Sequence, residues 1–322
     1  MNRRYLLHKL ATLLVTLYAT VTFNFLLFHV LPGSPVQLMA RAGHMNAAAR
    51  EQLVRFFGLN HSLPEQYLIY LRNMIHGQLG FSYVYRTPVT SVLAPAIGNT
   101  VLLLGAATFV TIVVGVALGV YSASRARTLT DASITVVTLG AWSMPDFFTG
   151  MLLIFGAAAW LHFLPISGIS TPGLQTGLLG HWWDVARHLV LPAVTLALVN
   201  VAQFSLITRN AVVEATVEDY VLTARAKGIG RRKVIIRHAL RNALLPIVTA
   251  ASLYVGLILG GAIQVETVFS WPGMGLLIYN SVEQRDYPVL EGCFLLFAIA
   301  VIATNFFADL LYHALDPRVR RT

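Results

Sequence analysis

Charged side chains are scarce in this chain of 322 residues. Asp, Glu, Lys and Arg make up only 11% of it, whereas hydrophobic residues make up 56% and the mean hydropathy is +0.67. Soluble domains carry roughly a quarter charged residues, because these side chains keep their surfaces in water. The composition therefore excludes an ordinary soluble domain and predicts an integral membrane protein.

Cysteine is almost absent too. The one cysteine, Cys293, lies in an apolar stretch, so the chain can form no internal disulfide and its fold must depend on helix packing. The ten histidines are scattered and have no cysteine at ligand spacing, so we expect no metal site. His8, His29 and His188 are expected to be polar residues near the ends of membrane spans.

Motifs of the common catalytic sites are missing as well. No Gly-Lys dipeptide occurs, so the chain lacks the phosphate-binding loop of P-loop ATPases. It also lacks G-x-S-x-G, H-E-x-x-H and a GxGxxG followed by an acid. We therefore predict that the chain is not an enzyme, has no catalytic residue and holds no cofactor of its own.

The net charge of +9 would by itself suit a protein that binds nucleic acid. In this chain, however, the basic residues lie between apolar stretches, where Lys and Arg act as orientation signals in a membrane. We therefore expect membrane lipids around the chain and no nucleic-acid partner.

Six stretches are apolar and long enough to cross a hydrocarbon core of about 30 Å. They cover residues 10–31, 99–121, 133–159, 188–213, 245–268 and 289–312. The first could be read as a signal peptide, but its apolar core exceeds the roughly 7 to 15 residues typical of one, which favours an uncleaved span. The prediction is an all-α protein with six transmembrane helices, with Pro192 in the first turns of the fourth.

Pro145 interrupts the third stretch, and a kink or break is expected there because proline removes a helical hydrogen bond and clashes with the preceding turn. Asp146 follows directly. Acids at membrane depth usually face a bundle interior or a pathway, so Asp146 is a candidate pathway residue, although it could equally cap the second half of a broken helix. Glu266, at the outer end of the fifth stretch, is a second candidate, and an acid wetted by interfacial water is the alternative.

The long stretch between the first two spans is predicted to form a small helical subdomain on the outer side. This divides the chain at residues 1–31, 32–98 and 99–322. Residues 46–57 are predicted to form one short helix. A capping box at Ser62 and Glu65 starts a second helix, which should end at Gly77. Residues 160–187 are expected to form an outer loop.

A strongly polar stretch separates the fourth and fifth spans, at residues 219–246. It holds seven basic residues: Arg225, Lys227, Arg231, Arg232, Lys233, Arg237 and Arg241. So many charges cannot cross hydrocarbon. Residues 222–227 favour a short helix ended by Gly228, and residues 231–242 favour a second, basic helix that ends before Pro246.

The distribution of Lys and Arg predicts the orientation of the chain. If both termini lie inside, the inner segments hold most of the basic residues, and the two short outer loops hold only Arg187 and Arg285. Positive charge accumulates on the cytoplasmic side of short loops. We therefore expect the polar loop, residues 214–244, and both termini to lie in the cytoplasm.

The polar loop resembles the cytoplasmic coupling loop of ATP-binding-cassette importer permeases. The matching residues are Asp219, Thr223, Ala224, Arg225, Ala226, Lys227 and Gly228. The match continues through the sequence RHALRNALLP, which is similar to the dipeptide, oligopeptide and nickel branch. A second signature of that branch follows the fifth span at Phe269, Trp271, Pro272, Gly273 and Gly275. Ser34 and Gln78 depart from the pattern, because the family commonly has Asp there.

The resemblance implies a type I importer permease fold in the bacterial cytoplasmic (inner) membrane. It implies that this chain forms half of a pathway with a second homologous permease chain, and that an extracytoplasmic binding protein delivers the solute. Two cytoplasmic ATPase subunits, which hold ATP and Mg, would act through the coupling loop. The expected solutes are di- or oligopeptides; nickel, glutathione or another small solute is the alternative. A self-contained secondary transporter is disfavoured, because it should show internal repeats.

Overall fold

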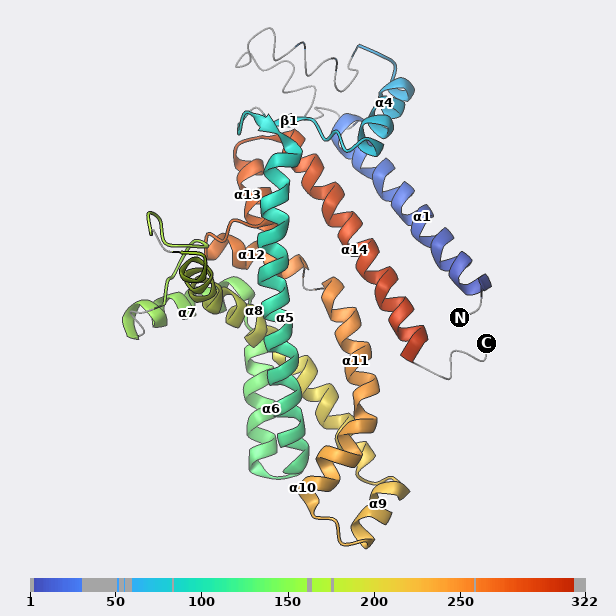
Figure 1. Ribbon diagram of the computed structural model, residues 1–322, viewed down its shortest axis with the longest axis vertical. Coiled ribbons are helices and arrows are strands. Elements are labelled where there is room, and N and C mark those ends of the chain that lie inside the picture. Colours follow the sequence, from blue (N-terminus) through green and yellow to red (C-terminus); the bar gives the residue numbers. More distant parts are fainter. Residues whose placement is uncertain are drawn as a thin grey trace. The chain divides into compact units, whose positions relative to one another are not determined.

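The computed structural model describes residues 3–30, 51, 55, 60–82, 84–160, 164–174, 177–257 and 259–315. Most of them are helical (Figure 1), which confirms the all-α prediction. The described strands are β1 (Phe81–Ser82) and β2 (Thr87–Pro88), which form an antiparallel hairpin that pairs Phe81 with Pro88 and Ser82 with Thr87. Most of the helix expected at residues 46–57 lies outside the described residues.

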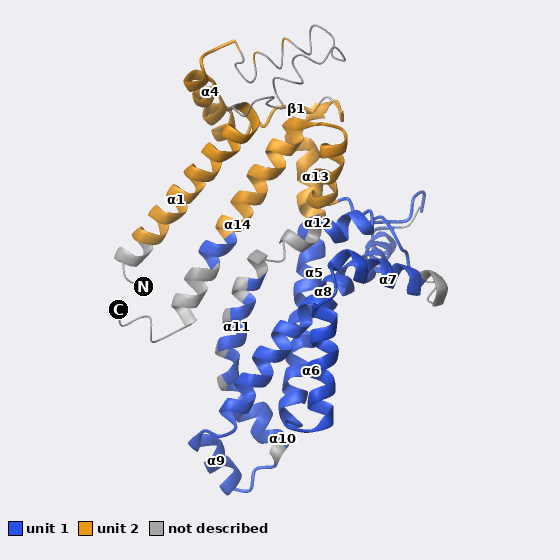
Figure 2. Ribbon diagram, turned by 180° about the vertical axis from the view of Figure 1, so that it is seen from behind, with its two compact units in different colours: residues 1, 100–272, 304–322 blue, residues 2–99, 273–303 orange. Residues whose placement is uncertain are grey.

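The chain divides into two compact units (Figure 2). Unit 1 comprises Met1, Thr100–Pro272 and Thr304–Thr322, and unit 2 comprises Asn2–Asn99 and Gly273–Ala303. Two helices contribute residues to both units: α5 (Val89–Ser124) and α14 (Tyr287–Leu315). The segment that follows the Pro-Gly turn therefore packs with the N-terminal third of the chain.

Unit 2 begins with α1 (Arg3–Phe25), which passes into a π-helical stretch, η1 (Leu26–Val30). The next described helix is α4 (Leu63–Ile75), and it starts with the predicted capping box: the backbone N–H of Ser62 donates to the Glu65 carboxylate at 2.9 Å. Hydrogen bonds from Ser62 hold the pKa of that carboxyl below its ordinary value. Gly77, at φ +69°, follows the end of the helix as predicted.

The core of unit 2 joins α5 and α14 to α13 (Met274–Glu283) through seven buried residues. These are Val89, Leu93, Ala96, Met274, Leu277, Val289 and Cys293. A hydrogen bond attaches the hairpin to the residue just before α14: the Ser82 hydroxyl donates to the buried Asp286 carboxylate. Burial raises the pKa of Asp286, while the hydrogen bond from Ser82 acts in the opposite direction.

Unit 1 contains eight described helical segments between Leu129 and Val268. They are α6 (Leu129–Trp142), α7 (Asp146–Trp160), α8 (Leu178–Ala215), α9 (Asp219–Ala226), α10 (Arg231–Lys233), η2 (Val234–Ala239), α11 (Leu240–Leu257) and α12 (Leu259–Val268). The predicted break at Pro145 is confirmed, since α6 and α7 meet at a bend of 104°. α8 is the central helix, because it packs against α6, α7, α11 and α12.

Two glycines of α5 bring its backbone against α8. A Cβ atom at Gly119 would lie 2.5 Å from the carbonyl oxygen of Ser205, and one at Gly115 would lie 2.6 Å from Cβ of Phe204. Both distances are shorter than van der Waals contact, so only glycine fits. The pair has the small-xxx-small spacing that lets membrane helices pack closely.

Four described helices are long and apolar enough to cross a membrane, and the bent pair α6 and α7 would make a fifth span. The four candidates are Leu7–His29, Val89–Ser124, Leu178–Ala215 and Tyr287–Phe307. The predicted fifth stretch forms two helices, α11 and α12, on either side of residue 258. The count of six spans stays a prediction.

Two helix starts were predicted too late. α5 begins at Val89 rather than at residue 99, because its first turns are buried in the core of unit 2. α8 begins at Leu178 rather than at residue 188, so Pro192 lies in its interior and not in its first turns. Asp184, which lies within the helix, is buried, and its carboxylate accepts from the backbone N–H and hydroxyl of Thr171.

The predicted end of the basic helix before Pro246 is wrong. α10, η2 and α11 follow one another without interruption, and Pro246 lies inside α11. The reason is tertiary: Ile235, Ala239 and Ala243, spaced four residues apart, are all buried in one cluster with the C-terminal ends of α5 and α8. This continuous buried face outweighs the local preference of proline for a helix start.

We predict that Gly119→Ala destabilises unit 1, because the new methyl group must push α8 away from α5. Overpacking of this kind costs about 1 to 3 kcal/mol. Thermal unfolding of the purified protein in detergent should show a lower midpoint. Gly105→Ala, in the same helix, is the matched control, since a Cβ there meets nothing within 4 Å. Equal midpoints for the two variants would contradict the close approach.

Candidate functional site

The polar loop contains the short helix that the sequence predicted, α9. It starts at Asp219, three residues earlier than expected, with Glu218 at its N-cap, and it ends at Ala226, with Lys227 as its C-cap. Gly228 follows with φ +76°, a backbone conformation that suits glycine. The acid in the first turn and Arg225 in the last complement the helix dipole.

The two faces of α9 have different environments. Val221 and Ala224 are buried against Val234 of η2, so they hold α9 on the segment that follows it. Ala226 and Gly228 are exposed. Of the two alanines in the matched motif, one therefore packs inside this chain and the other lies on the free face.

An ion pair holds α8, the helix that leads into α9, against the start of α6. Arg209 of α8 donates from Nε to Oδ1 of Asp131 and from Nη2 to Oδ2, both at 2.6 Å. Asp131 is 4% exposed and also accepts from the Ser122 hydroxyl at 2.5 Å and from the backbone N–H of Arg127 at 2.9 Å. The carboxylate is thus fully used, and the pair is bidentate.

This ion pair was not predicted from the sequence. Neither Arg209 nor Asp131 was assigned a partner. One signal was available, because Asp131 stands at the edge of an apolar stretch, where an acid usually needs a partner. Nothing in the sequence indicated which basic residue would supply it.

The break between α6 and α7 places several polar groups inside unit 1. Asp146 is the first residue of α7, and its Oδ1 is buried without a hydrogen-bond partner among the described residues. Thr149, three residues further on, has a hydroxyl in the same situation. Tyr254 of α11 is 2% exposed and belongs to the apolar core of unit 1, against which residues of α7 pack. Asp146 and Thr149 thus form a polar region at the start of α7.

Glu266, the other acid singled out from the sequence, has a different environment. It is completely buried in α12, and the Thr100 hydroxyl donates to its Oε1 at 2.6 Å. The hydrogen bond links α12 to α5 within unit 1. The carboxyl group is therefore engaged inside the protein.

The residues of the second signature lie in the turn that follows α12. Phe269 and Trp271 are almost fully buried in the core of unit 1, and the backbone N–H of Trp271 donates to the backbone carbonyl oxygen of Glu266 at 2.8 Å. Pro272 is exposed, and Gly273 is the N-cap of α13, followed by the buried Gly275 in its first turn. The signature thus ends one helix and begins the next.

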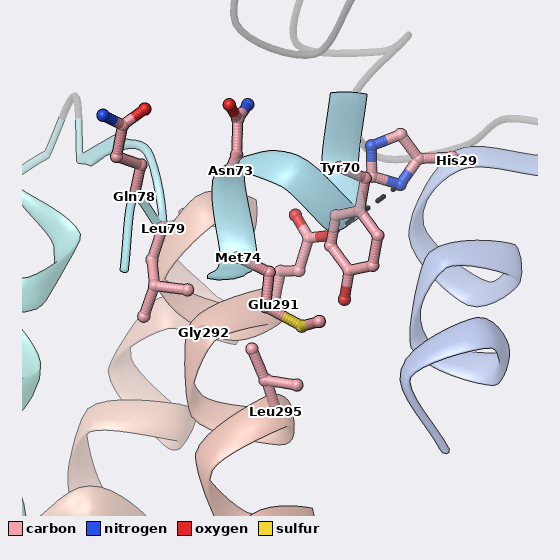
Figure 3. Close-up of a pocket in the computed structure, with 9 residues that line it drawn as sticks. All are labelled: His29, Tyr70, Asn73, Met74, Gln78, Leu79, Glu291, Gly292 and Leu295. Carbon is pink, nitrogen blue, oxygen red and sulfur yellow. Dashed lines mark ion pairs between the residues drawn. The ribbon is translucent and has the colours of Figure 1, made fainter. Parts of the chain in front are cut away.

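Unit 2 holds a small pocket of about 20 Å³, which is room for about one water molecule. Figure 3 shows its lining residues, which come from η1, α4 with the turn after it, and α14: His29, Tyr70, Asn73, Met74, Gln78, Leu79, Glu291, Gly292 and Leu295. His29 and Glu291 are 2% and 7% exposed, and Nδ1 lies 3.8 Å from Oε1. Burial raises the pKa of the Tyr70 phenol, and the Glu291 carboxylate adds to the effect.

This acid and imidazole face each other in the pocket, and their meeting was not predicted from the sequence. His29 was expected to be no more than a polar residue near a span end. The available signal was Glu291, an acid within the sixth apolar stretch. Its partner could not be identified, because the two residues are 262 positions apart in the sequence.

Among the described residues, no group of three or more His, Cys, Asp or Glu side chains is placed to hold a metal ion. The described helices thus define a multi-pass membrane protein of the all-α class, with a short exposed helix in a polar loop between two long apolar segments.

The chain belongs to the family of binding-protein-dependent transport system inner membrane components. Residues 115–321 match the model of that family, and residues 2–104 match the model of its N-terminal region. The resemblance stated from the coupling loop is confirmed. The protein is accordingly a transport subunit of the inner membrane, and the name of the family implies a binding protein as a partner.

Its relatives extend over the whole chain. A putative peptide permease protein of Brucella ovis is 39% identical over 321 residues, with 99% of each chain covered. The dipeptide transport system permease protein of Escherichia coli is 35% identical, and the glutathione transport system permease protein of Pectobacterium atrosepticum is 37% identical; both matches cover 98% of each chain.

We predict that Asp131→Asn lowers the stability of unit 1. A carboxamide presents only one acceptor to the guanidinium and turns an N–H toward it, so the bidentate pair is lost at a cost of about 2 kcal/mol. The midpoint of thermal unfolding in detergent measures the effect. Ser122→Ala, which removes a single hydrogen bond to the same carboxylate, should cost less. An Asp131→Asn variant as stable as Ser122→Ala would contradict this role.

Proposed function

We propose that this chain is the permease subunit of an ATP-driven importer and forms half of the membrane pathway for di- or oligopeptides. The observation that carries the proposal is the match of the whole chain to peptide permeases, combined with an exposed helix at the position of the coupling loop. The match to a glutathione permease favours the same chemical class, because glutathione is itself a peptide.

In this proposal α9 is the contact through which separate ATPase subunits act. ATP can shift a transporter between inward-open and outward-open states only through a contact whose energy differs between them. Ala226, Lys227 and Gly228 lie on the exposed side of α9 and are small or basic, which suits insertion into a groove on another subunit. Asp219 and Thr223 lie one turn apart in α9, and the Thr223 hydroxyl donates to the Asp219 carbonyl oxygen at 2.9 Å.

The ion pair of Arg209 and Asp131 connects this contact to the membrane helices. α8 leads to α9 through a three-residue connection, and its inner end is held against α6 by two short hydrogen bonds. A displacement of α9 would therefore move α8 and α6 together. We propose that this rigid connection carries the motion toward the break at Pro145.

The polar region around Asp146 is proposed to line the pathway. Buried polar atoms nearly always have a hydrogen-bond partner, and those of Asp146 and Thr149 have none among the described residues. Water or a passing peptide would supply the missing hydrogen bonds. Glu266 is proposed to have a packing role instead, because Thr100 already occupies its carboxylate.

The remaining partners follow from the same assignment. We propose that a second permease chain completes the pathway, that two ATPase subunits bind on the side of α9, and that the binding protein docks on the opposite side. Both termini and residues 214–244 would then be cytoplasmic. ATP and Mg would be held by the ATPase subunits. We also propose the domain boundaries expected from the sequence: residues 1–31 with the first span, the outer segment 32–98, and the permease core 99–322.

Ala226→Trp is expected to abolish ATPase stimulation by peptide-loaded binding protein while the permease still inserts and folds. The side chain is exposed, so a bulky residue obstructs a docking surface without disturbing the core. The measurement is ATP hydrolysis by the reconstituted complex, with and without loaded binding protein. Stimulation at the wild-type level would refute the role of α9.

Ala226→Ser is the matched control, because serine is small and should keep most of the stimulation. Ala224→Trp gives a useful contrast. It lies on the buried face, so it should lower the thermal unfolding midpoint as well as the ATPase activity.

Asp146→Ala is expected to reduce the amount of dipeptide imported per ATP hydrolysed by at least severalfold, while complex assembly is unchanged. The substitution removes a polar group that would hydrogen-bond the peptide in place of water. Uptake of labelled dipeptide into proteoliposomes, divided by ATP consumed, measures it. Ser143→Ala is the control, since Ser143 is exposed on the other side of the break and, among the described residues, its hydroxyl donates to Leu139 of its own helix. Equal ratios for the two variants would exclude Asp146 from the pathway.

A further inference from the structure

A groove of about 830 Å³ lies at one end of unit 1, apart from the coupling helix and the Asp146 region. Its walls come from the last two turns of α5, the turn that leads into α6, and the segment α10 to η2. The lining combines two kinds of side chain. Ala117, Val120 and Ile236 are apolar, whereas Arg125 and Arg232 are cationic.

Neither of the two guanidiniums forms an ion pair among the described residues. Among the described residues, arginines form ion pairs with acids at Arg55 with Glu51 and at Arg209 with Asp131. Arg125 and Arg232 are exposed, line the same groove and have no acidic partner there. Two cations that share a groove repel each other, so an anion between them would be favourable. Guanidinium groups bind phosphate oxygens in a bidentate manner.

One wall of the groove is the end of a candidate membrane span. α5 is a candidate membrane span that ends at Ser124, and Tyr121, which also lines the groove, has the amphipathic ring typical of the membrane interface. From Arg125 the apolar wall continues along α5 to Ala117, a distance of about 12 Å at 1.5 Å per residue. This length fits a glycerol group and the first carbons of an acyl chain.

We propose that this groove binds one anionic phospholipid, with its phosphate between Arg125 and Arg232 and an acyl chain along Ala117, Val120 and Ile236. The orientation in the proposed function would place the site in the cytoplasmic leaflet. Basic pockets between helices on that side are suited to anionic headgroups. The bound lipid would fasten the inner end of α5 to the segment that follows α9.

The test measures lipid retention by the full-length chain purified in detergent. Phosphatidylglycerol or phosphatidylcholine is added, and native mass spectrometry counts the molecules that stay bound. We expect one phosphatidylglycerol in preference to phosphatidylcholine. The pair Arg125→Gln with Arg232→Gln should weaken retention about 25-fold, since each basic residue near a membrane surface is worth roughly fivefold.

The matched control removes the same charge outside the groove, at Arg127→Asn with Lys233→Gln. Asparagine suits position 127, where φ is +66°. This pair should change retention by less than about threefold. Ala117→Phe keeps the charge but fills the apolar wall, and it should weaken phosphatidylglycerol binding without unfolding the protein.

Three results would overturn the proposal: equal retention of the two lipids by the wild type, equal losses in the two charge pairs, or displacement of the lipid by millimolar inorganic phosphate, which would show an anion site rather than a lipid site. The assay needs no ATPase subunit and no membrane orientation. Its failure is therefore distinguishable from failure of the coupling assay on Ala226→Trp.

Discussion

The close approach of α5 to α8 is the contact on which the rest of unit 1 depends. Gly115 and Gly119 leave no space for a side chain, so backbone meets backbone over a full helical turn. In a membrane the hydrophobic effect does not hold helices together, and van der Waals packing of small residues takes its place. This contact sets the position of α8, and α8 in turn supports α6, α7, α11 and α12.

Polar groups in this apolar bundle fall into two classes. Some are fully paired, such as Asp131 with Arg209 and Glu266 with Thr100, and they fix helices in register. Others have no partner within the described chain, such as the carboxyl oxygen of Asp146. Because an unpaired polar atom is costly at membrane depth, the second class marks places where water, solute or another subunit belongs.

The coupling loop illustrates how one short helix can serve two purposes. Its buried face, Val221 and Ala224, attaches it to η2, while its exposed face remains available to a partner. An exposed helix of eight residues would be unstable by itself, because nucleation costs more than so few hydrogen bonds return. Packing within the chain therefore makes a docking helix that keeps its shape before any partner binds.

The amino-acid sequence by itself determined the class of the protein and the local signals. Scarcity of charge predicted a membrane protein, Pro145 predicted the break between α6 and α7, the capping box at Ser62 predicted the start of α4, and Gly228 predicted the end of α9. Each of these rests on a preference of a few neighbouring residues, which acts whatever the rest of the chain does.

Only the tertiary structure decided where the helices begin and end and which polar side chains pair with each other. α5 and α8 start earlier than expected, and α11 passes through Pro246, because burial against distant segments outweighs local propensity. The partner of Asp131 and the meeting of His29 with Glu291 depend on which helices become neighbours. A single sequence contains the side chains of such contacts but not their distances, and folding alone brings them within reach.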